Sequence, residues 1–204
     1  AGGDLVDVFD ASKEQWSTAS LSQSRQALTA TSVGDLALFA GGYDALLQGS
    51  SRVDIYDAKN DKWSQSSLSA PRDFAAATTV GNRALFGGGS ADASHNSASD
   101  VVDIYDAATG QWSLAHLSQA RDMLAATTAG GKAFFAGGYN QEKGMSDVVD
   151  IYDSTTDQWS VAHLSEPRAQ LVAATVGSKA IFSGGANDPS GIASAVVDIF
   201  DTDT

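Results

Sequence analysis

The block VDIYD at 102–106 decides the fold of this chain, because it returns at a regular interval. It stands again at 53–57 and 149–153, and as VDVFD at 6–10 and VDIFD at 197–201. The first four blocks are each followed, 10 residues after the first valine, by a tryptophan: Trp16, Trp63, Trp112 and Trp159. These tryptophans are 47, 49 and 47 residues apart, a period that indicates a repeat architecture.

Two further markers keep the same spacing. An arginine follows each tryptophan by 9 residues, and a glycine pair begins 16 residues after each arginine. The arginines are Arg25, Arg72, Arg121 and Arg168, and the pairs begin at Gly41, Gly88, Gly137 and Gly184. Only the stretch from the glycine pair to the next block varies, at 11, 13, 11 and 12 residues. A packed unit resists insertions and an exposed loop tolerates them, so each repeat carries one variable loop.

Each repeat contains four short runs with the composition of β-strands. In order, they are an Ala- and Thr-rich run such as 124–129, an apolar run ending in the glycine pair (132–138), the VDIYD block, and the tryptophan run (158–164). No window sustains a helical period. Small side chains suit strands that converge, so we predict that the first run is innermost and the tryptophan run outermost. The chain then holds 17 strands: a third and fourth, three full sets, and a first, second and third.

The turn between the third and fourth strands opens with an aspartate: Asp10, Asp57, Asp106 or Asp153. We predict that each carboxylate accepts a hydrogen bond from the amide two residues on. For the glycine pairs, we predict that the missing side chains let the strand end pass under a tryptophan or tyrosine ring.

The order of arginine, small-residue strand, apolar strand with Gly-Gly, VDIYD and tryptophan resembles the kelch repeat of β-propellers. The resemblance implies an all-β kelch-type propeller region over 1–204, with four-stranded antiparallel blades. The repeat units are about 6–52, 53–101, 102–148 and 149–196, with an extra strand at 197–201. Kelch propellers usually have more than four blades, and the chain starts with Ala1 at a third strand. We therefore expect a processed chain or a segment of a longer one, whose ends meet further repeats or a second copy.

Composition excludes several classes of function. The chain has 12 Lys and Arg against 25 Asp and Glu, a net charge of −13, which disfavours binding to nucleic acid. It contains no cysteine, so disulfides, thiolate metal sites and a galactose-oxidase-like copper site are excluded. No apolar run approaches the roughly 18 residues of a membrane helix, so we expect no membrane insertion. Secreted and cytoplasmic locations both stay open.

No constellation of side chains indicates catalysis, a cofactor or a metal. His116 and His163 occupy a position that holds Ser20 and Ser67 in the first two repeats, which is typical of a tolerant surface site. His95 lies in the longest variable loop, where a solvated polar residue is expected. We therefore predict a protein that is not an enzyme.

The repeated arginines are predicted to be structural. A mid-strand aspartate recurs with them, and a carboxylate between packed sheets must be paired or hydrogen-bonded. We predict that each arginine bonds a repeated aspartate, or backbone carbonyls, from the set Asp7, Asp54, Asp103, Asp150 and Asp198.

For function, we predict a protein–protein interaction or assembly module. In antiparallel blades the loops between second and third strands and the links from fourth to first strands share one face, which carries all the length variation. Candidate contact residues on that face are Tyr43, Leu46, Leu47, His95, Asn96, Tyr139, Met145 and Ile192. The apolar members are either exposed contacts or buried loop anchors. Two alternatives stay open. One is a structural subunit of a larger extracellular assembly or filament, which further copies of the chain could build. The other is a carbohydrate-binding or carbohydrate-active propeller, which an aromatic cluster on one face would favour.

Overall fold

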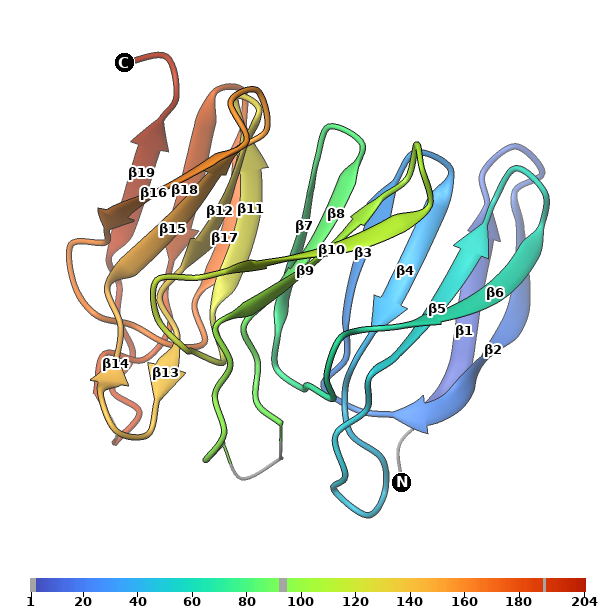
Figure 1. The fold of residues 1–204 in the computed structure, drawn as a ribbon, viewed down its shortest axis with the longest axis horizontal. Helices are drawn as coiled ribbons and strands as arrows, with labels where there is room; N and C mark the ends of the chain where they lie inside the picture. Colours follow the sequence, from blue (N-terminus) through green and yellow to red (C-terminus); the bar gives the residue numbers. More distant parts are fainter. Residues whose placement is uncertain (1–2, 92–94, 189) are drawn as a thin grey trace.

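The computed structural model describes residues 3–91, 95–188 and 190–204, which form antiparallel β-sheets lying side by side (Figure 1). Residues 92–94, in the variable loop 90–100, and Ala1 lie outside the described residues.

Three sheets are complete. Sheet II comprises β3 (Thr29–Val33), β4 (Leu36–Ala40), β5 (Arg52–Asp57) and β6 (Lys62–Ser67). Sheet III comprises β7 (Ala76–Val80), β8 (Arg83–Gly87), β9 (Val101–Asp106) and β10 (Gln111–His116). Sheet IV comprises β11 (Ala125–Ala129), β12 (Lys132–Ala136), β15 (Val148–Asp153) and β16 (Gln158–His163).

The two end sheets have fewer strands. Sheet I pairs β1 (Gly3–Asp10) with β2 (Gln15–Arg25), and sheet V comprises β17 (Val172–Val176), β18 (Lys179–Ser183) and β19 (Val197–Asp201). A small hairpin of β13 (Tyr139–Asn140) and β14 (Gly144–Met145) lies in one variable loop. Apart from this hairpin, the described strands follow the predicted order of 17, so that prediction is confirmed.

The Ala- and Thr-rich strands are innermost, as predicted. Strands β3, β7, β11 and β17 contact one another in succession, while the tryptophan strands lie at the opposite edge of their sheets. Threonine hydroxyls join neighbouring inner strands, with Oγ1–Oγ1 distances of 2.9 Å for Thr31–Thr79 and 2.7 Å for Thr127–Thr175. Larger side chains there would separate the sheets.

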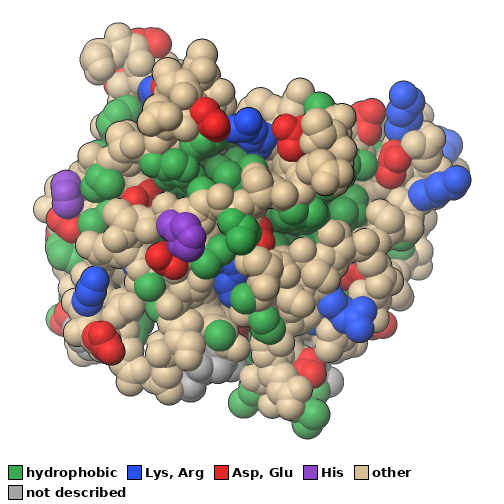
Figure 2. All heavy atoms as spheres, viewed as in Figure 1, with side chains coloured by type: hydrophobic (Ala, Val, Ile, Leu, Met, Phe, Trp, Pro, Cys, Tyr) green, Lys and Arg blue, Asp and Glu red, His purple; other side chains and the backbone are tan. Residues whose placement is uncertain are grey.

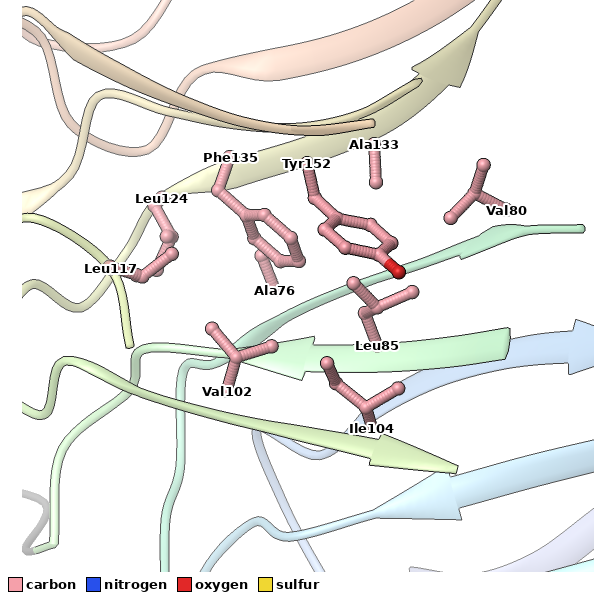
Figure 3. Packing of buried hydrophobic residues seen from close by; sticks show 10 residues of the cluster. All are labelled: Ala76, Val80, Leu85, Val102, Ile104, Leu117, Leu124, Ala133, Phe135 and Tyr152. Carbon is pink, nitrogen blue, oxygen red and sulfur yellow. The ribbon is translucent and has the colours of Figure 1, made fainter. Parts of the chain in front are cut away.

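Neighbouring sheets pack through two different faces. The forward face of a sheet, toward the next sheet in the chain, carries the valine and isoleucine of the block, such as Val102 and Ile104. The rear face carries the aromatic residues, such as Phe135 and Tyr152, and Figure 3 shows these two sets in contact. The same arrangement recurs at the other two junctions between described sheets II to V.

The outer faces of the end sheets are not covered by another sheet. On the forward face of sheet V, Ile199 is 59% exposed, although the equivalent Ile55, Ile104 and Ile151 are buried. On the rear face of sheet I, Phe9 and Trp16 are exposed. Each end thus presents one half of the junction that is formed between sheets II and III, III and IV, and IV and V.

The aspartate turns are confirmed. The amides of Ser12, Lys59, Ala108 and Thr155 donate to the Oδ1 atoms of the aspartates two residues earlier, at 2.9 to 3.0 Å. The explanation of the glycine pairs was wrong. Gly88 and Gly89 have φ of 69° and 94°, and a Cβ on Gly88 would lie 2.5 Å from the carbonyl oxygen of Arg121. The amide of Gly89 donates to that same oxygen at 2.9 Å. The glycines therefore admit the backbone of the next link rather than an aromatic ring.

Candidate partner-binding site

The variable loops and the links between sheets lie on one face, which we call the loop face and which is at the bottom of Figure 1. Each link pairs with the loop of the sheet that it enters. The backbone amides of Gln26 and Tyr43 each donate a hydrogen bond to the other residue's carbonyl oxygen, at 2.9 Å. Asp122 and Tyr139 form the same reciprocal pair, at 2.8 and 3.0 Å. Loops and links therefore form one continuous, backbone-bonded surface.

The repeated arginines hold this surface, and the prediction for them is confirmed. Arg121 Nη1 donates to the carbonyls of Gly137 at 2.7 Å and Val148 at 2.6 Å, and its Nη2 pairs with the carboxylate of Asp150. The other Oδ of Asp150 accepts the amide of Ser118 at 2.9 Å. Both side chains are buried. The equivalent pairs are Arg25–Asp54, Arg72–Asp103 and Arg168–Asp198.

The pairing predicted for each of the four arginines holds, but the burial expected of a mid-strand aspartate does not hold for Asp7. Each arginine pairs with the aspartate 29 to 31 residues after it, which leaves the first of the five aspartates without an arginine within the described residues. Asp7 is exposed on sheet I. Its carboxylate is therefore open to solvent and needs no buried cation.

Next to the arginines lies an open arc of residues with left-handed backbone. Ala27, Phe74, Met123 and Gln170 are equivalent positions, two residues after each arginine, with φ of 52°, 47°, 51° and 56°. Hydrogen bonds connect them from link to link: Phe74 N to Ala27 O at 3.2 Å, Met123 N to Phe74 O at 3.2 Å, and Gln170 N to Met123 O at 2.9 Å. We call these four residues the link ring.

The link ring borders two neighbouring depressions. The inner hollow, about 340 Å³, is lined by all four ring residues and by the residues that follow them, such as Leu124 and Leu171. The side pocket, about 220 Å³, lies between sheets IV and V and is lined by Met123, Tyr139, Met145, Ala169, Gln170, Ala186, Asp188 and Gly191. Met123 and Gln170 line both, so the two depressions are neighbours, and we call them together the loop-face groove.

The predicted contact residues are divided between this groove and the loop tips. Tyr139 and Met145 line the side pocket. Leu46 and Leu47 are 76% and 61% exposed, and Ile192 is also exposed, so these three are not buried loop anchors. The loop 43–51 projects at the bottom of Figure 2, where apolar side chains are visible.

An aromatic cluster forms at the other side of the link ring. Phe74 packs between Tyr43 and His95, with ring centroids 6.3 and 4.8 Å apart. His95 Nδ1 lies 2.7 Å from Oδ2 of the buried Asp122. The expectation of a solvated His95 was therefore wrong, because the link of sheet IV supplies an acceptor that the sequence position does not reveal. Asn96 beside it is exposed.

The two other histidines lie on the surface, in keeping with their expected tolerance. His116 and His163 are exposed, with Nδ1 atoms 3.3 and 3.2 Å from Asp100 and Asp147. Within residues 3–91, 95–188 and 190–204, no three His, Asp or Glu side chains converge as a metal site requires. The same residues include no helix with the length and hydropathy to span a membrane.

Phe74, Met123 and Gln170 were missed as candidate contacts, although the sequence contains a signal for them. The second residue after the repeated arginine changes from Ala to Phe, Met and Gln in an otherwise constant frame. Only its left-handed backbone and its place at the groove, which depend on contacts between sheets, make the position informative.

Comparison with known proteins supports the fold. A solved structure described as "Structure of YjhT" superposes with a TM-score of 0.71 at 16% identity, covering 97% of this chain and 73% of that chain. At this identity the likeness shows the all-β fold alone. No family model matches the chain, and no curated protein sequence matches it.

Proposed function

We propose that this chain is a kelch-type β-propeller region that acts as a non-enzymatic protein-binding module through the loop-face groove. The observation that carries the proposal is the convergence of Met123, Tyr139, Met145 and Gln170 on one pocket, where length and composition vary between repeats. The regular sheets and the buried arginine pairs form a rigid support for loops that differ. A scaffold of this kind is suited to recognition, since the support stays constant while contacts change.

The test is selection of a displayed random dodecapeptide library on the purified chain. Selected peptides should bind the native chain and lose affinity for Met145→Ser, which makes the side pocket polar without touching an ion pair. Leu114→Ser is the matched control, because Leu114 is an exposed apolar residue on the outer strand β10. Peptides that bind Met145→Ser as well as the native chain, or that are lost with Leu114→Ser, would place the binding surface elsewhere.

A second candidate function is assembly with further copies. It is favoured by the exposed forward face of sheet V and the exposed rear face of sheet I, which match the two sides of the internal junctions. In this alternative the loop face stays free and the end faces carry the contact.

A further inference from the structure

The link ring retains side chains at a backbone conformation that disfavours them. Left-handed φ costs an L-residue with a Cβ energy that glycine avoids, and bulky residues there are outliers. The chain has a second set of left-handed positions, in the turns after the third strands: Glu14, Asp61, Gly110 and Asp157. That set holds one glycine and two aspartates, which accept this conformation readily, and Glu14, whereas the ring holds Phe74, Met123 and Gln170 and no glycine or aspartate.

Backbone strain of this kind clusters at binding sites, where the side chain is needed. Gln170 is exposed, so its burial in a core does not explain why glycine is absent there. Its Nε2 lies 3.3 Å from Sδ of Met123, and both side chains line the side pocket. The side chains of Met123 and Gln170 therefore line the groove, although their left-handed backbone is energetically unfavourable.

The side pocket offers soft, apolar contacts. Its lining includes Met123, Met145 and the ring of Tyr139, with Ala169 and Ala186 between them. Methionine is flexible and polarizable, and it adapts its shape to an inserted apolar group. A volume of about 220 Å³ accommodates one such side chain rather than a folded element.

The surroundings of the pocket are acidic. Three segments carry most of the lining residues: 139–147, 164–170 and 186–196. Their acidic residues are Glu142, Asp147, Glu166 and Asp188. Their basic residues are Lys143 and the buried Arg168, which is paired with Asp198. Asp188 lines the pocket, and hydrogen bonds from the Ser190 hydroxyl and the Ile192 amide lower the pKa of its carboxyl group. Asp188 is thus the charged residue of the lining, and the segments that carry the lining hold four carboxylates against two basic side chains. An excess of negative charge at an apolar pocket favours basic residues beside the inserted group.

We infer that the side pocket takes one unbranched apolar side chain, of the size of methionine, from a partner segment with basic flanking residues, and that Met123 and Gln170 determine this specificity. The inference rests on the proposed function, because it names the chemistry of the partner at the same groove.

The chain contains two methionines, and both line this pocket. Labelling with ¹³C-methyl methionine therefore gives two signals that report on the site alone. The probes are synthetic peptides Gly-Lys-Gly-Lys-X-Lys-Gly-Lys-Gly with X as methionine, norleucine, alanine or glutamate. Methionine and norleucine peptides should shift both signals in a saturable way, and alanine and glutamate peptides should shift them at least about tenfold less at equal concentration.

A pair of glycine variants tests the role of the ring. Gln170→Gly and Glu14→Gly both remove an exposed side chain from a left-handed position, with φ of 56° and 52°. Both should keep or raise the thermal midpoint, since strain is relieved. Only Gln170→Gly should weaken the methionine peptide, by about fivefold or more, measured through the Met145 signal.

The outcomes separate the two proposals. If all four peptides shift the two methionine signals equally, the inferred specificity for an apolar side chain with basic neighbours is wrong. The same conclusion follows if glucose and galactose shift these signals as the peptides do. If library-selected peptides shift the methionine signals but the basic probes do not, the inferred chemistry is wrong and the proposed function stands. If neither shifts them, the groove is not the binding site and both fail. A lower thermal midpoint for Gln170→Gly than for Glu14→Gly would make Gln170 a structural residue and refute its assigned role.

Discussion

Replacing Arg121 by alanine removes a buried cation that joins three parts of the loop face. The guanidinium of Arg121 bonds the carbonyls of Gly137 and Val148 and the carboxylate of Asp150, and it is fully shielded from water. After the substitution, Asp150 keeps one partner in this group, the amide of Ser118. The perturbation therefore leaves a buried carboxylate largely uncompensated.

The magnitude follows from this geometry. Breaking a buried ion pair by removal of one partner costs about 3–5 kcal/mol, because the remaining charge stays desolvated. The stability of a typical domain is about 5–15 kcal/mol, so the loss is a third or more of the total in many cases. With a urea m-value of about 2 kcal/mol/M, the midpoint should fall by about 1.5–2.5 M.

The assay is urea unfolding followed by tryptophan fluorescence, since Trp112 and Trp159 lie in the sheets that Arg121 connects. Arg168→Ala should cost less, because the side chain of its partner Asp198 is 19% exposed against 4% for Asp150. Lys13→Ala, which removes an exposed pair with Asp10, is the control and should leave the midpoint unchanged. A loss below about 0.5 kcal/mol for Arg121→Ala, as at an ordinary surface site, would refute the reasoning.

Three further predictions concern the turns, the glycines and the end faces. The hydrogen bond from the Lys179 ammonium, with those from the Asp203 amide and the Ser178 hydroxyl, lowers the pKa of Asp201 to about 2. The contribution of Asp201 to stability is therefore full above an unfolded pKa of about 4 and is lost as the pH falls toward 2, so urea midpoints between pH 5 and 2 should show a shallower acid loss for Asp201→Asn. Gly88→Ala should destabilise more than Gly34→Ala in urea, because a Cβ at Gly34 meets open space and incurs only the left-handed penalty of about 1–2 kcal/mol. Light scattering should give a particle mass above the 21.0 kDa of a single chain, because the end faces associate. Ile199→Asp should lower this mass, whereas Leu114→Asp should not. A compact monomer of the native chain would contradict the prediction.

Much of the architecture could be predicted because the repeats constrain one another. Strand order, the innermost Ala- and Thr-rich strands and the aspartate turns depend on local patterns that recur in four copies. The hairpin of Tyr139–Asn140 with Gly144–Met145 was not predicted, since two-residue strands leave no periodic pattern. The pairing of each arginine with a repeated aspartate was predicted from burial and charge, but not which aspartate each arginine takes. The burial expected of a mid-strand aspartate was wrong for Asp7, which is exposed.

The candidate site was predicted only in part, for a reason that lies in its construction. Tyr139 and Met145 stand in a variable loop and could be selected from the sequence, whereas Met123 and Gln170 stand in links whose constant residues suggest a purely structural role. Contacts between sheets bring loop and link together, and those contacts are made by backbone groups that any residue possesses. Sequence patterns therefore carry little information about such bonds. For the same reason, the role predicted for Gly88 and Gly89 was wrong.

The division between constant and variable residues explains how one link can serve both stability and recognition. In the link 117–123, Arg121 points into the sheet and bonds groups that every repeat supplies, so its identity is constrained. Met123, two residues later, is held by backbone hydrogen bonds to Phe74 and Gln170, which place no demand on its side chain. Substitution at Met123 can therefore change the groove without weakening the support, provided that the new residue tolerates the left-handed backbone. The structure thus separates the residues that fix the loop face from those that give it chemical character.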